Sequence, residues 1–201
     1  MTANADLQTL IDGWLSELNQ RDLSRHTVEA YLRDVTQFIA FLAEHSGQEV
    51  SPASFDTLKA MDVRSFLAKR RNVEATQSRS LARSLSGLRS FTRYLSEKNY
   101  PVSAAFKIVN SPRIPKSLPR PMSQNDALQM IALAGDMSSN KWENLRNQAL
   151  LVLIYGCGLR ISEALNLSYG DRPKPDNISI RITGKGKKQR DAPILPLIEN
   201  A

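Results

Sequence analysis

The sequence predicts a mainly helical protein, with a four-helix N-terminal domain and a second domain of helices that ends in a β-hairpin. Three observations predict this class. Apolar residues recur at helical spacing from residue 5 to residue 98. Five of the ten prolines fall between residues 99 and 121, which marks a break between domains. Apolar and polar residues alternate over residues 178–183, just before a turn rich in glycine and lysine.

Four helices are expected in the first domain, residues 1–108. Apolar side chains lie on one face of the segment 7–18 and on one face of the segment 28–42. A third helix is expected to begin near Asp62, a residue type that caps helix N-termini. The fourth has one row of apolar residues that must pack inward: Leu81, Leu85, Leu88, Phe91 and Leu95.

The fourth helix also carries a second, basic face. Its members are Arg79, Arg83, Ser86, Ser90 and Arg93, with Arg89 beside them. Residues 64–98 contain nine Lys or Arg but only two acids, Glu74 and Glu97. A surface helix stabilised by i,i+4 ion pairs would interleave acids with bases. The excess therefore favours a face that meets phosphates, with a solvated basic face as the alternative.

Residues 109–121 are predicted to form an extended, basic, proline-rich linker, because closely spaced prolines exclude both helix and central strand. The linker carries Arg113 and Lys116. A clamp around a duplex would need a linker of this kind, although a solvated hinge would explain the same residues.

The second domain, residues 122–201, is expected to open with a helix capped by Ser123 and Asp126. A further helix begins near residue 141 and ends in "NQALLVLIYG", which is apolar nearly all round and is therefore expected to be central. Glycines then break the chain before a helix that starts at Arg160. A β-hairpin follows, with Lys185 at its tip.

Composition narrows the class of protein. The formal net charge is +7, which points to a polyanionic partner, nucleic acid first and an acidic membrane surface second, with a merely basic soluble protein as the alternative. The start has no signal-peptide pattern, and the apolar run 149–156 is too short to cross a bilayer, so we expect a cytoplasmic protein that needs no membrane.

The one cysteine, Cys157, excludes an intrachain disulfide and is expected to be a small buried residue. No Cys/His cluster has metal spacing, and "GKGKK" lacks the layout of a nucleotide-binding P-loop.

Two cations in the second domain are candidates for chemistry, Arg160 at a helix mouth and Lys185 at the hairpin tip. Neither is diagnostic alone. An i,i+3 ion pair with Glu163 would explain Arg160, and Lys185 could be one of several solvated turn lysines.

In this order, however, these segments resemble the tyrosine recombinase or phage integrase family, most closely the XerC type of its Xer branch. The stretch that resembles the family's first catalytic-arginine motif is "RNQALLVLIYGCGLRISEALNL", and the one that resembles its lysine hairpin is "ISIRITGKGKKQRDAPIL". Upstream, "SRHTVEAYLRDVTQFIAFL" and "SRSLARSLSGLRSFTRYL" are similar to two helices of the family's core-binding domain. The resemblance covers residues 5–197. It implies a four-helix core-binding (SAM-like) domain followed by the first part of an α+β catalytic domain.

The resemblance also implies a chemistry. In this family a tyrosine attacks a DNA phosphodiester and forms a 3′-phosphotyrosyl link, without a metal or nucleotide cofactor. Arg160 would hold phosphate oxygens, and Lys185 would protonate the leaving 5′-oxygen as a general acid. Glu163 would orient Arg160 or the helix end.

The implied partners are double-stranded DNA and sister recombinase subunits, which in the full-length family form a tetramer on two sites. The implied roles are DNA recombination and integration, and chromosome or plasmid dimer resolution at cell division. Residues expected to contact DNA come from two helices and the linker: His26, Thr27, Arg79, Arg83, Ser86, Arg89, Arg113 and Lys116.

The sequence departs from the family pattern after the hairpin. The family places a His-x-x-Arg motif, a further His or Trp and the nucleophilic tyrosine C-terminal to the lysine. Here the five tyrosines, Tyr31, Tyr94, Tyr100, Tyr155 and Tyr169, all precede Lys185. The sequence thus resembles a recombinase truncated within its catalytic domain, and strand cleavage by this chain alone is expected to fail. A non-catalytic DNA-binding relative is the alternative.

Overall fold

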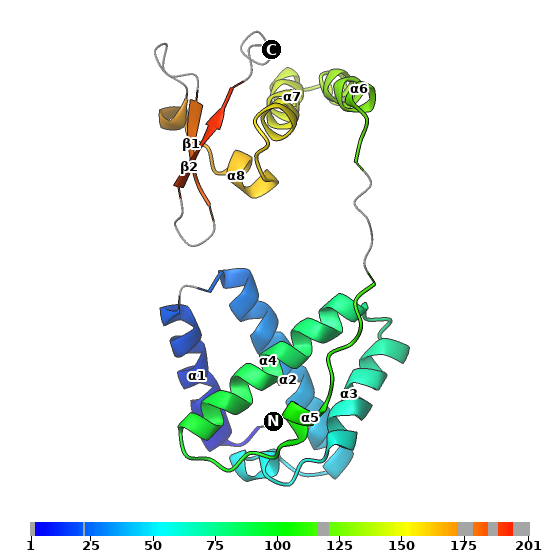
Figure 1. The fold of residues 1–201 in the computed structure, drawn as a ribbon, viewed down its shortest axis with the longest axis vertical. Coiled ribbons are helices and arrows are strands. Elements are labelled where there is room, and N and C mark those ends of the chain that lie inside the picture. The colour runs from blue at the N-terminus through cyan, green and yellow to red at the C-terminus, as the bar shows by residue number, and fades with distance from the viewer. Residues whose placement is uncertain (1–2, 22, 116–120, 173–178, 185–188, 195–201) are drawn as a thin grey trace. The chain divides into compact units, whose positions relative to one another are not determined.

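The computed structural model describes residues 3–21, 23–115, 121–172, 179–184 and 189–194. The chain forms two compact units, residues 1–117 and 118–201, and each is described by itself. The division falls within the segment expected to be a linker. The predicted class, mainly helical with one two-stranded hairpin, is confirmed (Figure 1).

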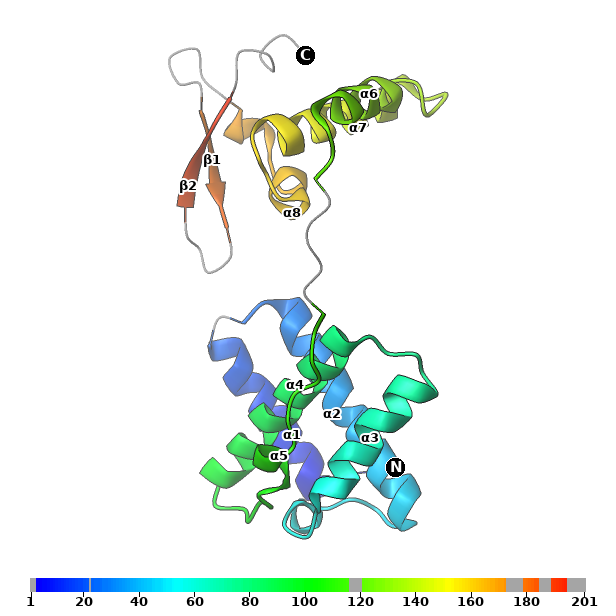
Figure 2. The same cartoon turned by 45° about the vertical axis from the view of Figure 1, so that its right-hand side comes forward.

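Unit 1 contains the four expected helices. They are α1 (Ala5–Gln20), α2 (Arg25–Ser46), α3 (Ala60–Asn72) and α4 (Ser78–Glu97). Two short elements lie outside the sequence prediction, the 3-10 turn η1 (Pro52–Phe55) and helix α5 (Ala105–Ile108). Helix α4 crosses α2, and both helices begin at the same end of the unit (Figures 1 and 2).

Polar side chains define where these helices begin. The Asn4 carboxamide accepts from the backbone N–H of Leu7 at the start of α1. The Ser24 hydroxyl accepts from the backbone N–H of Thr27 at the start of α2. The prediction that Asp62 caps α3 is wrong, because the helix begins at Ala60. Asp62 lies within the first turn, and its carboxylate accepts the backbone N–H of Lys59 at 2.7 Å. A carboxylate in the first turn accepts a backbone N–H that has no partner within the helix. Its negative charge also interacts favourably with the positive end of the helix dipole.

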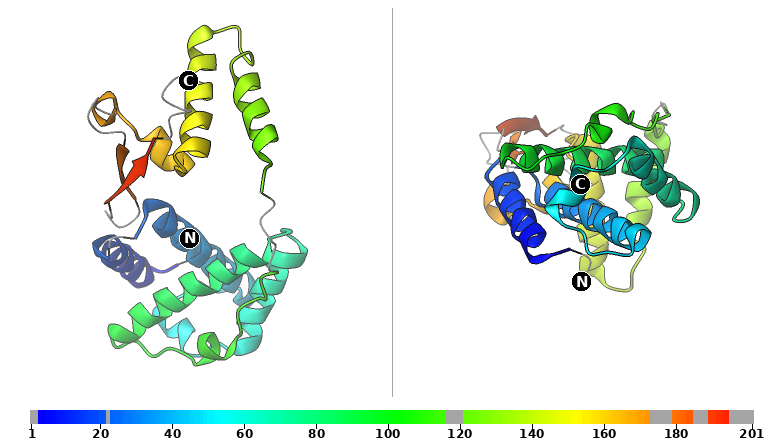
Figure 3. Two further views of the ribbon diagram at one scale, coloured as in Figure 1. Left: turned by 45° about the horizontal axis from the view of Figure 1, so that its top comes forward. Right: turned by 90° about the horizontal axis from the view of Figure 1, so that it is seen from below.

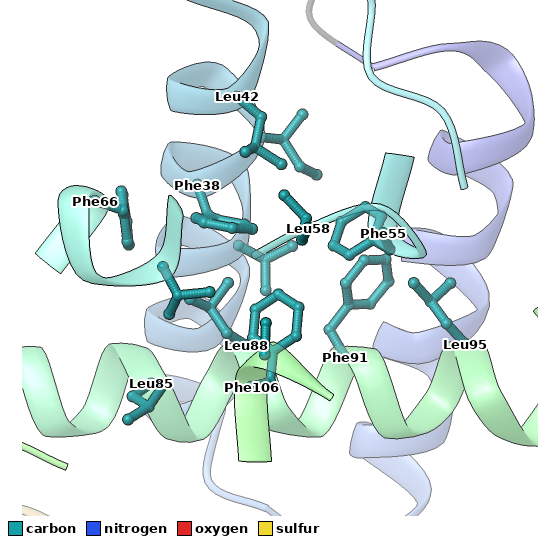
Figure 4. Close-up of a cluster of buried hydrophobic side chains, with 14 of the residues drawn as sticks. Phe38, Leu42, Phe55, Leu58, Phe66, Leu85, Leu88, Phe91, Leu95 and Phe106 are labelled. Atoms are coloured by element: carbon teal, nitrogen blue, oxygen red, sulfur yellow. The ribbon is translucent and has the colours of Figure 1, made fainter. Parts of the chain in front are cut away.

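The apolar faces of unit 1 meet in an aromatic core. Phe38 of α2 is fully buried, and its ring centroid lies 5.1 Å from that of Phe66 and 5.8 Å from that of Phe106, both edge-on (Figure 4). On α1, Trp14 packs edge-on against Phe91 of α4 at 5.2 Å. Burying one such ring stabilises the fold by about 1.5–3 kcal/mol. This core therefore fixes how α2, α3 and α4 lie relative to one another.

Helices α1 and α4 contact each other beside a glycine. A Cβ on Gly13 of α1 would overlap the hydroxyl of Tyr94 on α4. A larger residue at position 13 would therefore have to displace the Tyr94 side chain or α1.

Unit 2 contains the elements expected after the linker. They are α6 (Gln124–Ala134), α7 (Lys141–Gly156), α8 (Ile161–Leu165), the 3-10 turn η2 (Tyr169–Asp171), β1 (Ser179–Thr183) and β2 (Gln189–Pro193). Helices α6 and α7 lie side by side (Figure 3). The predicted cap of α6 is confirmed, since Ser123 Oγ accepts from the N–H of Asp126 at 3.1 Å and donates to its carboxylate at 2.7 Å.

Strands β1 and β2 pair antiparallel, with Ile180 opposite Ala192 and Ile182 opposite Arg190. The predicted alternation is confirmed, because Ile180 and Ile182 are buried with Ala192. They form a small core with Cys157, Leu159 and Ala164. The hairpin thus packs directly against the turn that precedes α8.

The expectation that α7 is a central helix is wrong for the described structure, in which none of its residues is buried. Leu150, Leu153 and Ile154 pack against the small core, while Leu145 and Tyr155 are exposed. Helix α7 contacts both α6 and α8, but these neighbours bury none of its residues fully. Among the described residues, no helix combines the length and apolar character that a bilayer crossing requires.

Candidate functional site

The turn between α7 and α8 presents Arg160 to solvent. Gly158 takes a left-handed conformation, with φ of 61°, between the buried Cys157 and Leu159. Arg160 follows as the N-terminal capping residue of α8. Its side chain is 73% exposed. Buried neighbours therefore fix the backbone of this turn, while the guanidinium faces outward.

Glu163 binds both ends of Arg160. Its carboxylate accepts the backbone N–H of Arg160 at 2.8 Å and the guanidinium Nη1 at 2.7 Å. These bonds, the backbone one foremost, lower the pKa of Glu163 to about 2. The i,i+3 ion pair that the sequence offered as an alternative is therefore present. It leaves most of the Arg160 side chain accessible, so orientation by Glu163 and binding of a further anion are compatible.

Sequence reasoning missed a second arginine at this turn. Arg190 of β2 donates from Nη2 to the Glu163 carboxylate at 2.9 Å and to the carbonyl of Gly158 at 3.3 Å. Arg190 lies two residues before the buried Ala192, and period-two alternation places both on the face that meets the turn. That alternation was the signal that could have found it. Two guanidinium groups thus share one carboxylate, which leaves the turn with a net positive charge.

Lys185 and Lys116 lie outside the described residues. The convergence of Lys185 and Arg160 on one phosphate stays a prediction.

The first turn of α2 carries His26 and Thr27. The His26 side chain is 96% exposed. The Thr27 hydroxyl lies 2.8 Å from the hydroxyl of Ser24, the residue that caps the helix. His26, whose Nδ1 lies 4.0 Å from a carboxylate oxygen of Glu29, is thus accessible to a partner, whereas Thr27 contacts the capping residue.

The basic face of α4 is not uniform. Arg79 and Ser86 are exposed, and the Ser86 hydroxyl donates to the carbonyl of Ala82. Arg83 is 38% exposed and pairs with Asp34 of α2, its Nε 3.0 Å from the carboxylate.

Arg89 is engaged within the protein. Its guanidinium donates to the carbonyl oxygens of Phe106 at 2.8 Å and Val109 at 2.6 Å, at the end of α5. Arg113 is exposed in the segment that follows. A role for Arg89 at DNA stays a prediction, but its contacts give it a structural role as well.

Several bases counted between residues 64 and 98 have acidic partners on another helix. Lys69 pairs with Glu44 at 2.6 Å, and Arg70 pairs with Asp34 at 2.8 Å. Both acids belong to α2, so a search along α3 and α4 alone could not find them. The basic excess at the surface is correspondingly smaller than the sequence suggested.

Sequence profiles of two known domains match the chain in order. The profile described as "Phage integrase, N-terminal SAM-like domain" matches residues 11–99, and the profile "Phage integrase family" matches residues 121–200. The chain belongs to the phage integrase, or tyrosine recombinase, family.

Curated relatives in this family carry the name Tyrosine recombinase XerC. The protein of Brucella suis biovar 1 (strain 1330) is 43% identical over 200 residues, which are 99% of this chain and 63% of that protein. The protein of Mesorhizobium japonicum is 42% identical over 196 residues, which are 97% of this chain and 62% of that protein. The chain therefore spans a little under two thirds of the length of these recombinases.

Solved structures of tyrosine recombinases share the fold. The XerH site-specific recombinase bound to its palindromic difH substrate matches with a TM-score of 0.67 at 18% identity, over 96% of this chain and 59% of that chain. A lambda integrase tetramer bound to a Holliday junction matches with a TM-score of 0.66 at 15% identity, over 94% of this chain and 51% of that chain. The predicted family and the predicted fold class are both confirmed.

Proposed function

We propose that this chain is the DNA-binding and phosphate-contacting part of a Xer-type site-specific recombinase. The observation that carries the proposal is the exposed Arg160 guanidinium, held by Glu163 next to the buried Leu159, within the segment that matches the integrase family. A planar guanidinium that is fixed yet accessible suits the capture of two oxygens of one phosphate.

In the proposed reaction, a tyrosine attacks the phosphodiester and the strand is later rejoined from the 3′-phosphotyrosyl intermediate. Arg160 stabilises the charge that develops on the non-bridging oxygens, and Lys185 protonates the leaving 5′-oxygen. No tyrosine follows Lys185 in the sequence, so we propose that this chain does not cleave DNA by itself.

The proposed DNA contacts of unit 1 come from the first turn of α2 and the exposed face of α4. Arg79 and Ser86 are accessible, and His26 projects from the start of the neighbouring helix. Arg113 and Lys116 would follow the phosphate backbone along the linker. In the family role, sister subunits assemble as a tetramer on two sites in the cytoplasm and resolve chromosome or plasmid dimers.

Binding to duplex DNA tests the first part of this proposal. We expect fluorescence anisotropy to show an affinity that falls steeply with salt, and Arg79→Ala to reduce the slope of log K against log salt by about 0.9. Lys141→Ala, a change at an exposed residue of α7 outside the proposed interface, is the matched control. An affinity that does not depend on salt would contradict the proposal.

The second candidate is a DNA-binding module that does not cut DNA and in which the same residues, Arg160 and Lys185, contact phosphate. A nicked suicide substrate, which traps a covalent protein–DNA adduct, tests the expectation that both candidates share, namely that this chain does not cleave DNA by itself. We expect none from this chain. An adduct that disappears on changing one of its tyrosines to phenylalanine would establish a catalytic chain and refute the expectation.

A further inference from the structure

Asp34 is a buried carboxylate that joins three helices of unit 1. It is fully buried, and its Oδ1 accepts from Arg70 Nη1 at 2.8 Å and from Ser84 Oγ at 2.9 Å. Its Oδ2 accepts from Arg83 Nε at 3.0 Å. The bonds connect α2 with α3 through Arg70 and with α4 through Ser84 and Arg83.

Asp34 has a buried counter-charge besides Arg83. Arg70 contacts Asp34 at 2.8 Å, and it also pairs with the more exposed Glu74 at 3.3 Å. Arg83 is the more accessible of the two arginines and lies on the basic face of α4. The ion pair between Asp34 and Arg83 therefore holds the Arg83 guanidinium in place at the surface.

The hydrogen bonds of Arg83 leave one edge of its guanidinium available. Nε and Nη2 face Asp34, at 3.0 and 3.5 Å from its two oxygens. Nη1 donates to no acceptor in the described parts of the chain. A guanidinium is a rigid fork of five donors, so fixing one edge sets the direction of the other.

We propose that Arg83 reads a guanine in the major groove through this free edge, and that Asp34 is its positioning residue. The inference rests on the proposed DNA binding by α4. Two parallel donors match O6 and N7 of guanine, and this contact depends on direction. A phosphate contact fixes position without reading the base, and Arg79, one turn earlier and without an ion pair in the described structure, suits that part. A guanidinium already held by Asp34 also loses less side-chain entropy when DNA binds.

The experiment compares base preference with affinity. Wild-type protein is used to select bound duplexes from randomised DNA, and dissociation constants are then measured for the preferred duplex and for one with the guanine replaced by adenine. Arg83→Lys keeps the charge but cannot make the two-pronged contact. We expect it to lose about tenfold in guanine preference while its salt slope stays unchanged. Arg79→Ala should weaken binding to both duplexes equally.

Asp34→Asn tests the positioning part in protein whose helical circular dichroism shows that it is folded. Asp34→Asn retains Arg83 but weakens its ion pair, so we expect the preference for guanine to fall. If Asp34→Asn does not fold, Arg83→Lys still decides whether Arg83 reads the base.

The proposal is overturned if wild type shows no guanine preference, or if Arg83→Lys retains that preference in full. A folded Asp34→Asn protein with wild-type preference would remove Asp34 from the positioning role. Failure of the proposed function has a different signature, because duplex binding itself would then be absent or independent of salt.

Discussion

Replacing Asp34 by alanine would leave the guanidinium of Arg70 buried without its main partner. The change removes four hydrogen bonds to the carboxylate, one each from Arg70 and Ser84 and two from Arg83. Removing one partner of a buried ion pair costs about 3–5 kcal/mol. Glu74 still accepts from Arg70 Nε at 3.3 Å, so we expect the lower end, about 3 kcal/mol.

For a unit of this size, about 4 °C in Tm accompanies each kcal/mol, so unit 1 should melt about 12 °C lower. Thermal unfolding followed by helical circular dichroism measures the shift. Asp12→Ala, which removes an exposed carboxylate from α1, is the matched control and should change stability by less than about 0.5 kcal/mol.

A second variant separates the cost of leaving the Arg70 charge unpaired from the cost of the lost hydrogen bonds. Adding Arg70→Met to Asp34→Ala removes the unpaired guanidinium and should recover part of the stability. The reasoning is refuted if Asp34→Ala melts with wild type, or if the double variant is less stable than Asp34→Ala alone.

Three further measurements test Glu163, Gly13 and Gly158. The pKa of Glu163, lowered from 4.5 to about 2, means that its contribution to stability is complete above about pH 4.5 and is lost as pH falls toward 2; a carboxyl NMR titration should show this midpoint, and Arg190→Ala should raise it. Gly13→Ala should lower the free energy of unfolding in urea by about 1–3 kcal/mol. Adding Tyr94→Phe removes the hydroxyl that the new methyl group overlaps and should recover part of this loss; no recovery would argue against the overlap. Gly158→Ala should cost about 1 kcal/mol in the same assay through its left-handed backbone alone, since a Cβ there meets nothing within 4 Å; no loss at all would speak against this account.

Much of unit 1 follows from local sequence patterns. The apolar rows of the four helices are buried as their spacing predicts, because each pattern repeats within a single helix. The ion pairs of Asp34 could not be predicted in this way. Its partner Arg83 lies 49 residues away, and no periodic pattern links the two positions.

In unit 2 as well, a local sequence pattern identified one arginine of the site and missed another whose position depends on tertiary packing. Arg160 stands in a recognisable turn, whereas Arg190 reaches Glu163 across 27 residues through the packing of the hairpin. The failed expectation for α7 has a related cause. An apolar sequence shows that a helix can be buried, but burial itself depends on neighbours that the pattern does not contain.

The buried position of Cys157 turns the protein's one thiol into a reporter of the turn that carries Arg160. Burial raises the pKa of this thiol, so the reactive thiolate is scarce while the turn is closed. A soluble disulfide reagent can then modify Cys157 only during transient opening of the small core around Leu159 and Ala164. The labelling rate would therefore report how often this segment opens, without any introduced probe.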